Sequence, residues 1–96
     1  MRSDNEQKIG AVLQAFLKAN GLEDKFLETE IYQRWEELAG KAINLKTKKI
    51  EYKKGVLTVR LTSATLRQEL QMRRTALLEH INMRLPQHPV QEIRFL

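Results

Sequence analysis

The first part of the chain carries hydrophobic residues at the spacing of an amphipathic helix. Ser3, with Glu6 three residues later, has the form of a capping box, and Asn20-Gly21 is typical of a helix end. The hydrophobic positions between these signals are Ile9, Val12, Leu13, Phe16 and Leu17. Because the polar side is not especially basic, we expect this helix, within residues 1–21, to pack against the core. Use as a partner-binding or membrane-surface helix is the alternative.

A second helical pattern runs from Lys25 to about Asn44, with Asp24 placed to cap it. Its hydrophobic stripe consists of Leu27, Ile31, Trp35, Leu38 and Ala42. Trp35 is the one tryptophan, and its place within the stripe favours a large core residue over a stacking platform for a base. Gly40 interrupts the pattern and marks either a kink or the close approach of another segment.

Alternation of hydrophobic and polar residues over 49–62 predicts a β-hairpin. A two-residue turn at Lys54-Gly55 puts both hydrophobic sets on one side of the sheet. The resulting pairs are Tyr52–Leu57 and Ile50–Val59 on that side, and Lys49–Arg60 and Glu51–Thr58 on the other. Two opposed cations destabilise a sheet unless solvent or an anion lies between them. We therefore expect the polar face to be solvated or to meet a partner.

The last third of the chain predicts one interrupted helix and one strand. Ser63 is placed to cap a helix whose hydrophobic line would include Arg74. We expect a break or bend near Met72; the alternative is one continuous helix in which Arg74 extends its charged end to the rim. Pro86 ends the helix, and residues 90–96 form a strand with its hydrophobic side chains inward. The predicted fold is α+β in the order α-α-β-β-α(-α)-β. It is a single domain over residues 1–96, with a three-stranded sheet and helices on one face.

The positive charge of the chain is concentrated in one segment. The formal net charge is +5, and residues 46–74 hold nine Lys or Arg against two Glu. The segment before it is slightly acidic and the segment after it is neutral. Such a local excess suits an anionic partner, and nucleic-acid phosphates are the natural one. The alternative is a solvated face that keeps an edge strand from aggregating. The candidate phosphate contacts are Lys48, Lys49, Lys53, Lys54, Arg60, Arg67, Arg73 and Arg74.

The residues that usually carry catalysis are missing from the sequence. There is no cysteine, and His80 and His88 have no second ligand at metal-binding spacing. The four glycines are too dispersed for a phosphate-binding loop. We therefore expect no enzyme activity, no metal, no cofactor and no small-molecule substrate. No signal-peptide pattern and no run of membrane-spanning length occurs, so we expect a cytoplasmic protein without a membrane partner.

An ordered set of short motifs resembles one known family. The motifs are Trp35 with Gly40, Gly55-Val56-Leu57-Thr58-Val59, Thr62-Ser63-Ala64, Glu69-Leu70, Leu77-Leu78, Ile81-Asn82 and Val90 followed by Ile93-Arg94-Phe95. Over residues 24–96 the chain is similar to the bacterial DciA-like family, which includes a loader that interacts with the replicative helicase DnaB. The stretch from Glu69 to Arg74 resembles the short members of Bacteroidetes-type bacteria. Leu66 stands where many members have a second Trp, which is expected to change core packing only.

The resemblance implies a KH-like domain over residues 22–96 and a role at the nucleoid in DNA replication. It also implies a DnaB-type helicase as a protein partner. No Gly-x-x-Gly loop is present, so the usual KH route to RNA is not expected. The prediction is a non-catalytic replication accessory protein that binds single- or double-stranded DNA through phosphates. The alternatives are a protein-interaction module whose basic face meets an acidic partner, and a general RNA-binding KH-like module.

Overall fold

The computed structural model describes the backbone of residues 2–96 and the side chains of residues 8–96. Within this range six helices and three strands follow one another. In chain order they are α1 (Arg2–Ala19), α2 (Glu23–Gln33), α3 (Trp35–Ala39), α4 (Lys41–Leu45), β1 (Thr47–Lys53), β2 (Val56–Leu61), α5 (Ala64–Met72), α6 (Arg74–Met83) and β3 (Glu92–Phe95). The order confirms the α+β prediction.

The sheet has the strand order β1-β2-β3, with β1 antiparallel to β2 and β3 parallel to β2. The predicted register is confirmed, since Tyr52 lies opposite Leu57 and Lys49 lies opposite Arg60. Lys54 and Gly55 form the turn with φ values of 49° and 86°, and two positive φ values suit the twist of a two-residue hairpin. A Cβ at Gly55 would lie 3.2 Å from the Gln91 side chain. Both the positive φ and this close approach therefore favour glycine at the position.

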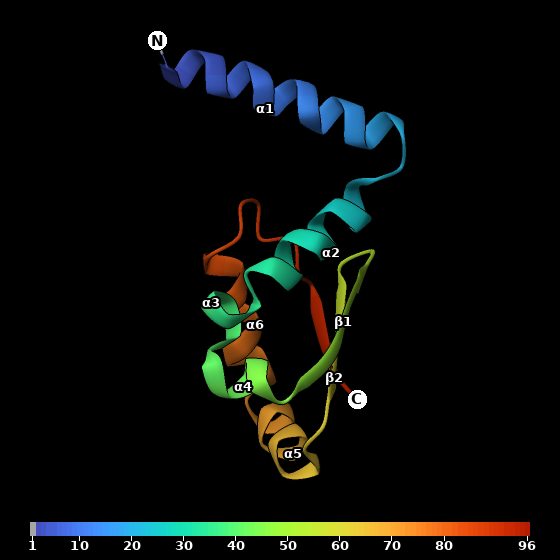
Figure 1. Ribbon diagram of the computed structural model, residues 1–96, viewed down its shortest axis with the longest axis vertical. Coiled ribbons are helices and arrows are strands. Elements are labelled where there is room, and N and C mark those ends of the chain that lie inside the picture. Colours follow the sequence, from blue (N-terminus) through green and yellow to red (C-terminus); the bar gives the residue numbers. More distant parts are fainter. Residues whose placement is uncertain (1) are drawn as a thin grey trace.

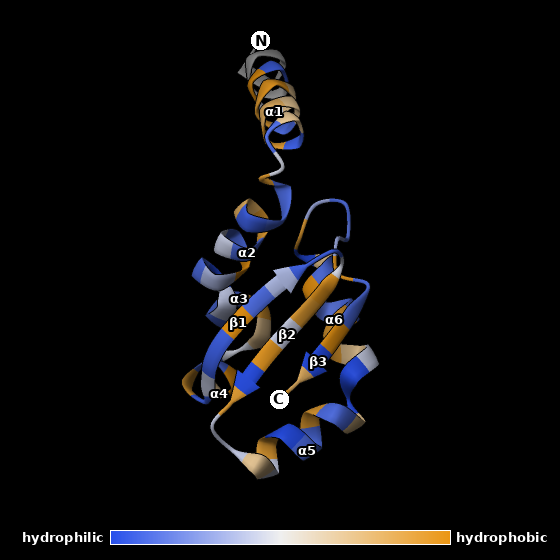
Figure 2. Ribbon diagram, turned by 90° about the vertical axis from the view of Figure 1, so that its right-hand side faces the viewer, coloured by the Kyte–Doolittle hydropathy of each residue, from blue (hydrophilic) through white to orange (hydrophobic). Residues whose placement is uncertain are grey.

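The helices of the body cover one face of the sheet and leave the other bare, as Figures 1 and 2 show. Side chains from both layers form one core, which consists of Ile31, Trp35, Leu38, Ile50, Tyr52, Leu57, Val59, Leu61, Leu70, Ile81, Leu85, Val90, Ile93 and Phe95. Trp35 is fully buried in it, which confirms the interpretation of that residue as part of the core. Its indole N–H donates to Thr47 Oγ1 at 2.9 Å, so the buried polar atom is satisfied.

The expectation that the first helix packs against the core is wrong. Helix α1 stands away from the body (Figure 1), and of its described hydrophobic side chains Leu17 alone is buried. Gly21 has φ 66°, and Leu22 N donates to Leu17 O at 2.9 Å, so the chain reverses direction directly after the helix. That turn aims α1 outward. The capping box of Ser3 and Glu6 lies outside the residues whose side chains are described.

The prediction of one helix from Lys25 to Asn44 is also wrong. The chain bends at Arg34 and again at Gly40, which has φ 98°, so three helices take the place of one. Nothing lies within 4 Å of a Cβ built on Gly40, so the positive φ explains this glycine and a close approach does not. Asp24 lies inside α2 and does not cap it; its carboxylate accepts from Lys54 N at 2.9 Å.

The predicted break in the last helix is confirmed, and it falls at Arg73 between α5 and α6. Ser63 caps α5 as predicted, with its Oγ accepting from Leu66 N at 3.1 Å. Asn82 is a buried polar side chain near the end of α6. Its amide donates to Val90 O at 2.6 Å and accepts from Val90 N at 2.9 Å. This pair of bonds holds the loop after α6 so that β3 enters the sheet beside β2.

Candidate nucleic-acid interface

The bare side of the sheet carries the polar half of each strand, and we call it the open face. The inward positions of the three strands are buried, so the alternating positions must point away from the helices. Figure 2 looks onto this face, which no helix crosses. The charged and polar residues of the open face are Lys49, Glu51, Lys53, Thr58, Arg60, Glu92 and Arg94.

Glu51 separates the two cations that face each other across β1 and β2. Its Oε1 lies 3.9 Å from Lys49 Nζ and 3.8 Å from Arg60 Nε. All three side chains are about half exposed, so these pairs contribute little to stability. The anion expected between two opposed cations is thus supplied by the sheet itself. A phosphate would have to share Lys49 and Arg60 with this carboxylate.

Arg94 adds to the open face a cation that is absent from the candidates predicted from the sequence. It lies on β3 opposite Thr58, and its Nε is 2.8 Å from Glu92 Oε2. A shallow hollow of about 340 Å³ runs across the sheet beside it, lined by Glu51, Lys53, Lys54, Val56, Thr58 and Arg94. Three cations border this hollow against one carboxylate, so its charge favours an anion.

Helix α2 holds the outer edge of β1 in place. Glu28 Oε2 accepts from Tyr52 N at 3.0 Å, two residues before the Asp24 contact with Lys54 N. The backbone hydrogen bond from Tyr52 lowers the pKa of the Glu28 carboxyl, with burial acting against it. Burial, followed by the charge of Asp24, raises the pKa of the Tyr52 phenol, whose hydroxyl donates to Pro89 O at 2.9 Å. The hairpin that presents Lys53 and Lys54 is therefore anchored on its edge.

Lys48 lies at an irregularity in the pairing of β1. The register shifts between Thr47 and Lys49, which marks a β-bulge at Lys48. Its side chain is exposed and, together with Lys49, borders a second hollow of about 300 Å³ on the edge of β1, beside the exposed ring of Tyr32. The two neighbouring lysines therefore share this edge, and Lys49 also lies beside Glu51 on the open face.

The three remaining candidate residues lie on the helices that follow the hairpin. Arg67 is half-buried on α5, Arg73 sits at the junction, and Arg74 begins α6. In Figures 1 and 2, α5 lies at the end of the sheet opposite the Lys54-Gly55 turn. The structure thus places Lys49 opposite Arg60 and puts Lys53 on the same face at the turn end of the hairpin. The three arginines lie apart from the turn. Among the described side chains none of these arginines is in an ion pair.

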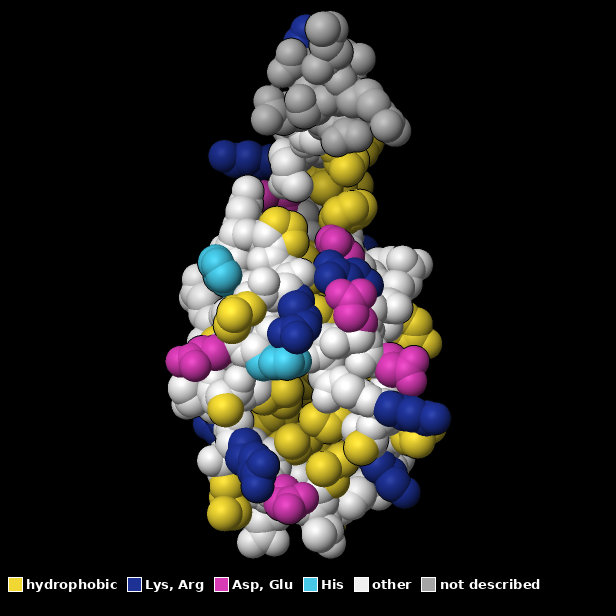
Figure 3. Space-filling model, turned by 90° about the vertical axis from the view of Figure 1, so that its left-hand side faces the viewer, with side chains coloured by type: hydrophobic (Ala, Val, Ile, Leu, Met, Phe, Trp, Pro, Cys, Tyr) yellow, Lys and Arg dark blue, Asp and Glu magenta, His cyan; other side chains and the backbone are white. Residues whose placement is uncertain are grey.

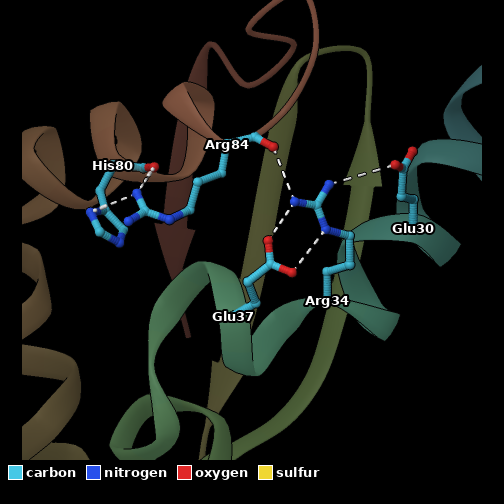
Figure 4. A network of polar contacts seen from close by, with 5 residues as sticks. All are labelled: Glu30, Arg34, Glu37, His80 and Arg84. Atoms are coloured by element: carbon cyan, nitrogen blue, oxygen red, sulfur yellow. Dashed lines mark hydrogen bonds and ion pairs between the residues drawn. The ribbon is translucent and has the colours of Figure 1, made fainter.

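A cluster of charged groups on the helical side ties α2 and α3 to the end of α6 (Figure 4). Arg34 bonds Glu37, lies 3.7 Å from Glu30 Oε1, and donates to Arg84 O at 3.2 Å. The hydrogen bond from the Arg34 guanidinium to the Glu37 carboxylate raises the pKa of Arg34 and lowers that of Glu37. Arg84 in turn contacts His80 Nδ1 at 3.2 Å. Each charge here has a structural partner, so the cluster explains helix packing rather than chemistry.

Neither a metal-binding cluster nor a membrane-spanning helix occurs in the described part of the chain. No three His, Asp or Glu side chains among residues 8–96 gather as a metal site would require. None of the described helices is both long and apolar enough to span a membrane.

Fold and surface together define a class of protein. It is a small α+β protein with a bare, cation-bearing sheet face and a separate projecting helix. The family model described as "Dna[CI] antecedent, DciA" matches residues 8–95, and the chain belongs to this family. The match includes most of α1, whereas the resemblance found from the sequence covered residues 24–96 and left α1 out. Neither the curated proteins nor the solved structures contain a match to the chain.

Proposed function

We propose that this chain is a non-catalytic accessory protein of DNA replication that binds nucleic-acid phosphates on its open face. We propose further that it binds the DnaB-type replicative helicase and acts at the nucleoid to place that helicase on DNA. The family supports the association with helicase loading in general. The family does not establish a contact with DNA, and we propose that contact from the surface of this chain.

The observation that carries the DNA contact is the gathering of cations on a surface that no helix covers. Lys49, Lys53 and Arg60 come from adjacent strands and point the same way, with Arg94 beside them. An uncovered sheet face with long cationic side chains can bind a phosphate backbone without reading base edges. Binding by this face is therefore expected to depend strongly on salt and weakly on sequence.

The test is charge reversal with a matched control. Lys49, Lys53 and Arg60 are changed together to Glu, and Lys8, Lys18 and Lys41 are changed together to Glu in the control. Both triples alter the net charge equally, but the control residues lie on α1 and α4 rather than on the strands of the open face. We expect the first triple to abolish binding to a labelled oligonucleotide in low salt and the control to retain most of it.

Two additional measurements make the outcome decisive. The first is binding by a second triple variant with Gln at the same three sites, in which Glu51 does not face new carboxylates. The second is circular dichroism, which reports whether each variant is folded.

The outcomes distinguish the proposal from its alternatives. Equal affinity for the oligonucleotide in the open-face and control triples would contradict the assignment of this face. RNA bound more tightly than DNA of equal length would favour an RNA-binding module. Helicase binding without any DNA binding would favour a protein-interaction module.

A further inference from the structure

Helix α1 carries a hydrophobic stripe that nothing in the described structure covers. The exposed fractions are 69% for Ile9, 68% for Val12, 39% for Leu13 and 56% for Phe16, and we call these four residues the α1 stripe. With Lys8 they border a shallow hollow of about 420 Å³. Figure 3 shows hydrophobic side chains gathered where α1 rises from the body. A continuous exposed apolar surface of this kind marks an interaction site.

The body of the protein does not need this stripe for its own core. The core cluster begins at Ile31 and is complete without any residue of α1. Leu17 alone reaches inward from the helix, and the turn at Gly21 then directs the rest of α1 away from the body. Loss of the stripe is therefore expected to leave the fold intact, which makes the stripe testable by substitution.

The spacing of the α1 stripe fits insertion into a groove. Its members stand at i, i+3, i+4 and i+7, the anchor pattern of an amphipathic helix lying in a hydrophobic groove. Pairing with a second copy would bury only four large side chains on each side. A stable homodimer uses about 20–30 residues a side. A groove surrounds each anchor and so buries more of it than a second narrow stripe would.

The charges around the stripe indicate which residues the rim of that groove should carry. Among the described residues, Lys8 is the charged side chain that borders the hollow of the α1 stripe, whereas Lys18 lies on the opposite side of the helix. Lys8 is a cation, so an apolar groove with an acidic residue at its edge is the complementary surface. The same lysine would repel a basic surface and disfavour binding to it.

We propose that the α1 stripe docks into an apolar, acid-rimmed groove on the replicative helicase. This inference rests on the function proposed above and adds to it the surface by which the helicase is held. The stripe lies on α1 and the open face lies on the sheet, and Figure 2 shows the two well apart. One copy of the chain can therefore hold helicase and nucleic acid at the same time.

The experiment measures complex formation with the replicative helicase of the same organism, by size-exclusion chromatography with light scattering and by titration. The test variant changes Val12 and Phe16 to Gln, which removes two anchors and keeps a good helix former. The control variant changes Ala11 to Gln on the opposite side of α1. We expect the test variant to bind helicase at least about thirty-fold more weakly. The control variant and the open-face triple should bind it as the wild type does.

Each outcome decides the proposal. Weaker helicase binding in the Val12/Phe16 variant, with unchanged affinity for DNA and an unchanged circular dichroism spectrum, supports it. Equal helicase binding in that variant overturns the inference and leaves the proposed function standing. A wild-type chain that forms no complex overturns the helicase part of the proposed function and the inference with it. A dimer of the chain alone that the same variant dissociates overturns the inference in favour of a second copy.

Discussion

Glu28 of α2 accepts a hydrogen bond from the backbone N–H of Tyr52 in β1, with 3.0 Å between Oε2 and N. Asp24 does the same for Lys54 N one turn earlier in the helix, at 2.9 Å. An edge strand normally presents such N–H groups to solvent or to another chain. Here two carboxylates of one helix satisfy them, and this fixes the hairpin whose other side forms the open face.

The first prediction concerns the pH dependence of stability at Glu28. Its native pKa is held below the ordinary value of 4.5, so its contribution to stability is complete above that value. The contribution is lost as pH falls below 4.5 through the lowered native pKa. Glu28→Gln keeps an acceptor oxygen but does not titrate. We expect it to lower the free energy of unfolding by about 1–2 kcal/mol at neutral pH. Urea unfolding followed by circular dichroism measures the difference.

The decisive feature is how that difference changes with acid. Between neutral pH and about pH 3 the gap between wild type and Glu28→Gln should close, because the wild-type carboxyl becomes protonated. Glu79→Gln, on the exposed side of α6, serves as the control and should change little at any pH. A gap that stays constant down to the lowest pH would show that the charge of Glu28 does not support the hairpin.

The second prediction uses the hydrogen bond between Trp35 and Thr47. Thr47→Val keeps the shape of the side chain but leaves the buried indole N–H without its acceptor. Thr47 Oγ1 also donates to Ile43 O at 2.7 Å, and that bond is lost as well. We expect a loss of about 1–3 kcal/mol in the free energy of unfolding. Trp35 is the one tryptophan, so its fluorescence follows unfolding directly. Stability equal to wild type would mean that the indole N–H finds another acceptor.

The third prediction separates two glycines by their backbone conformations. Gly55→Ala forces a side chain into φ +86° and against Gln91, so we expect a loss of about 1–2 kcal/mol and a lower melting temperature. Gly10 lies within α1 with open space around it, and Gly10→Ala should raise helicity without lowering the melting temperature. Thermal scans by circular dichroism compare them. A tolerated Gly55→Ala would contradict the tight turn.

The fourth prediction concerns Arg94, which the structure adds to the open face. Arg94→Gln is expected to weaken binding to DNA about three- to ten-fold, the effect of losing one phosphate contact. Arg84→Gln removes the same charge on the helical side, where Arg84 contacts His80, and should leave the affinity unchanged. Fluorescence anisotropy with one oligonucleotide compares the two variants. Equal losses would point to net charge rather than to the open face.

The hairpin could be predicted in detail because its signals are local. A period of two and one glycine between the strands determined the turn and the register. Ser63 likewise indicated the start of α5, because its side chain can cap a helix. Arg74, a charged residue on the hydrophobic line, indicated that the helix is interrupted near its position. The failures came where local signals compete with geometry. The stripe of α1 looks like any core-facing stripe, and only the turn at Gly21 decides where the helix points.

The candidate site could be predicted only in part, because the faces of strands are easier to infer than their neighbours. Alternation placed Lys49, Lys53 and Arg60 on one side of the hairpin. Arg94 lies on the same face only because β3 pairs with β2. The sequence of a short strand does not indicate which strand it will pair with. The bulge at Lys48, which interrupts the alternation of β1, also has no local signal. Charge density along the sequence therefore overstated how closely the eight cations lie together.

The central claim is that the open face binds nucleic-acid phosphates, and the salt dependence of binding tests it most directly. The affinity for a single-stranded oligonucleotide is measured over a range of salt concentrations for wild type and for the triple Gln variant at Lys49, Lys53 and Arg60. If these side chains neutralise phosphates, the slope of log affinity against log salt becomes shallower by about two in the variant. The same slope in both proteins would contradict the claim.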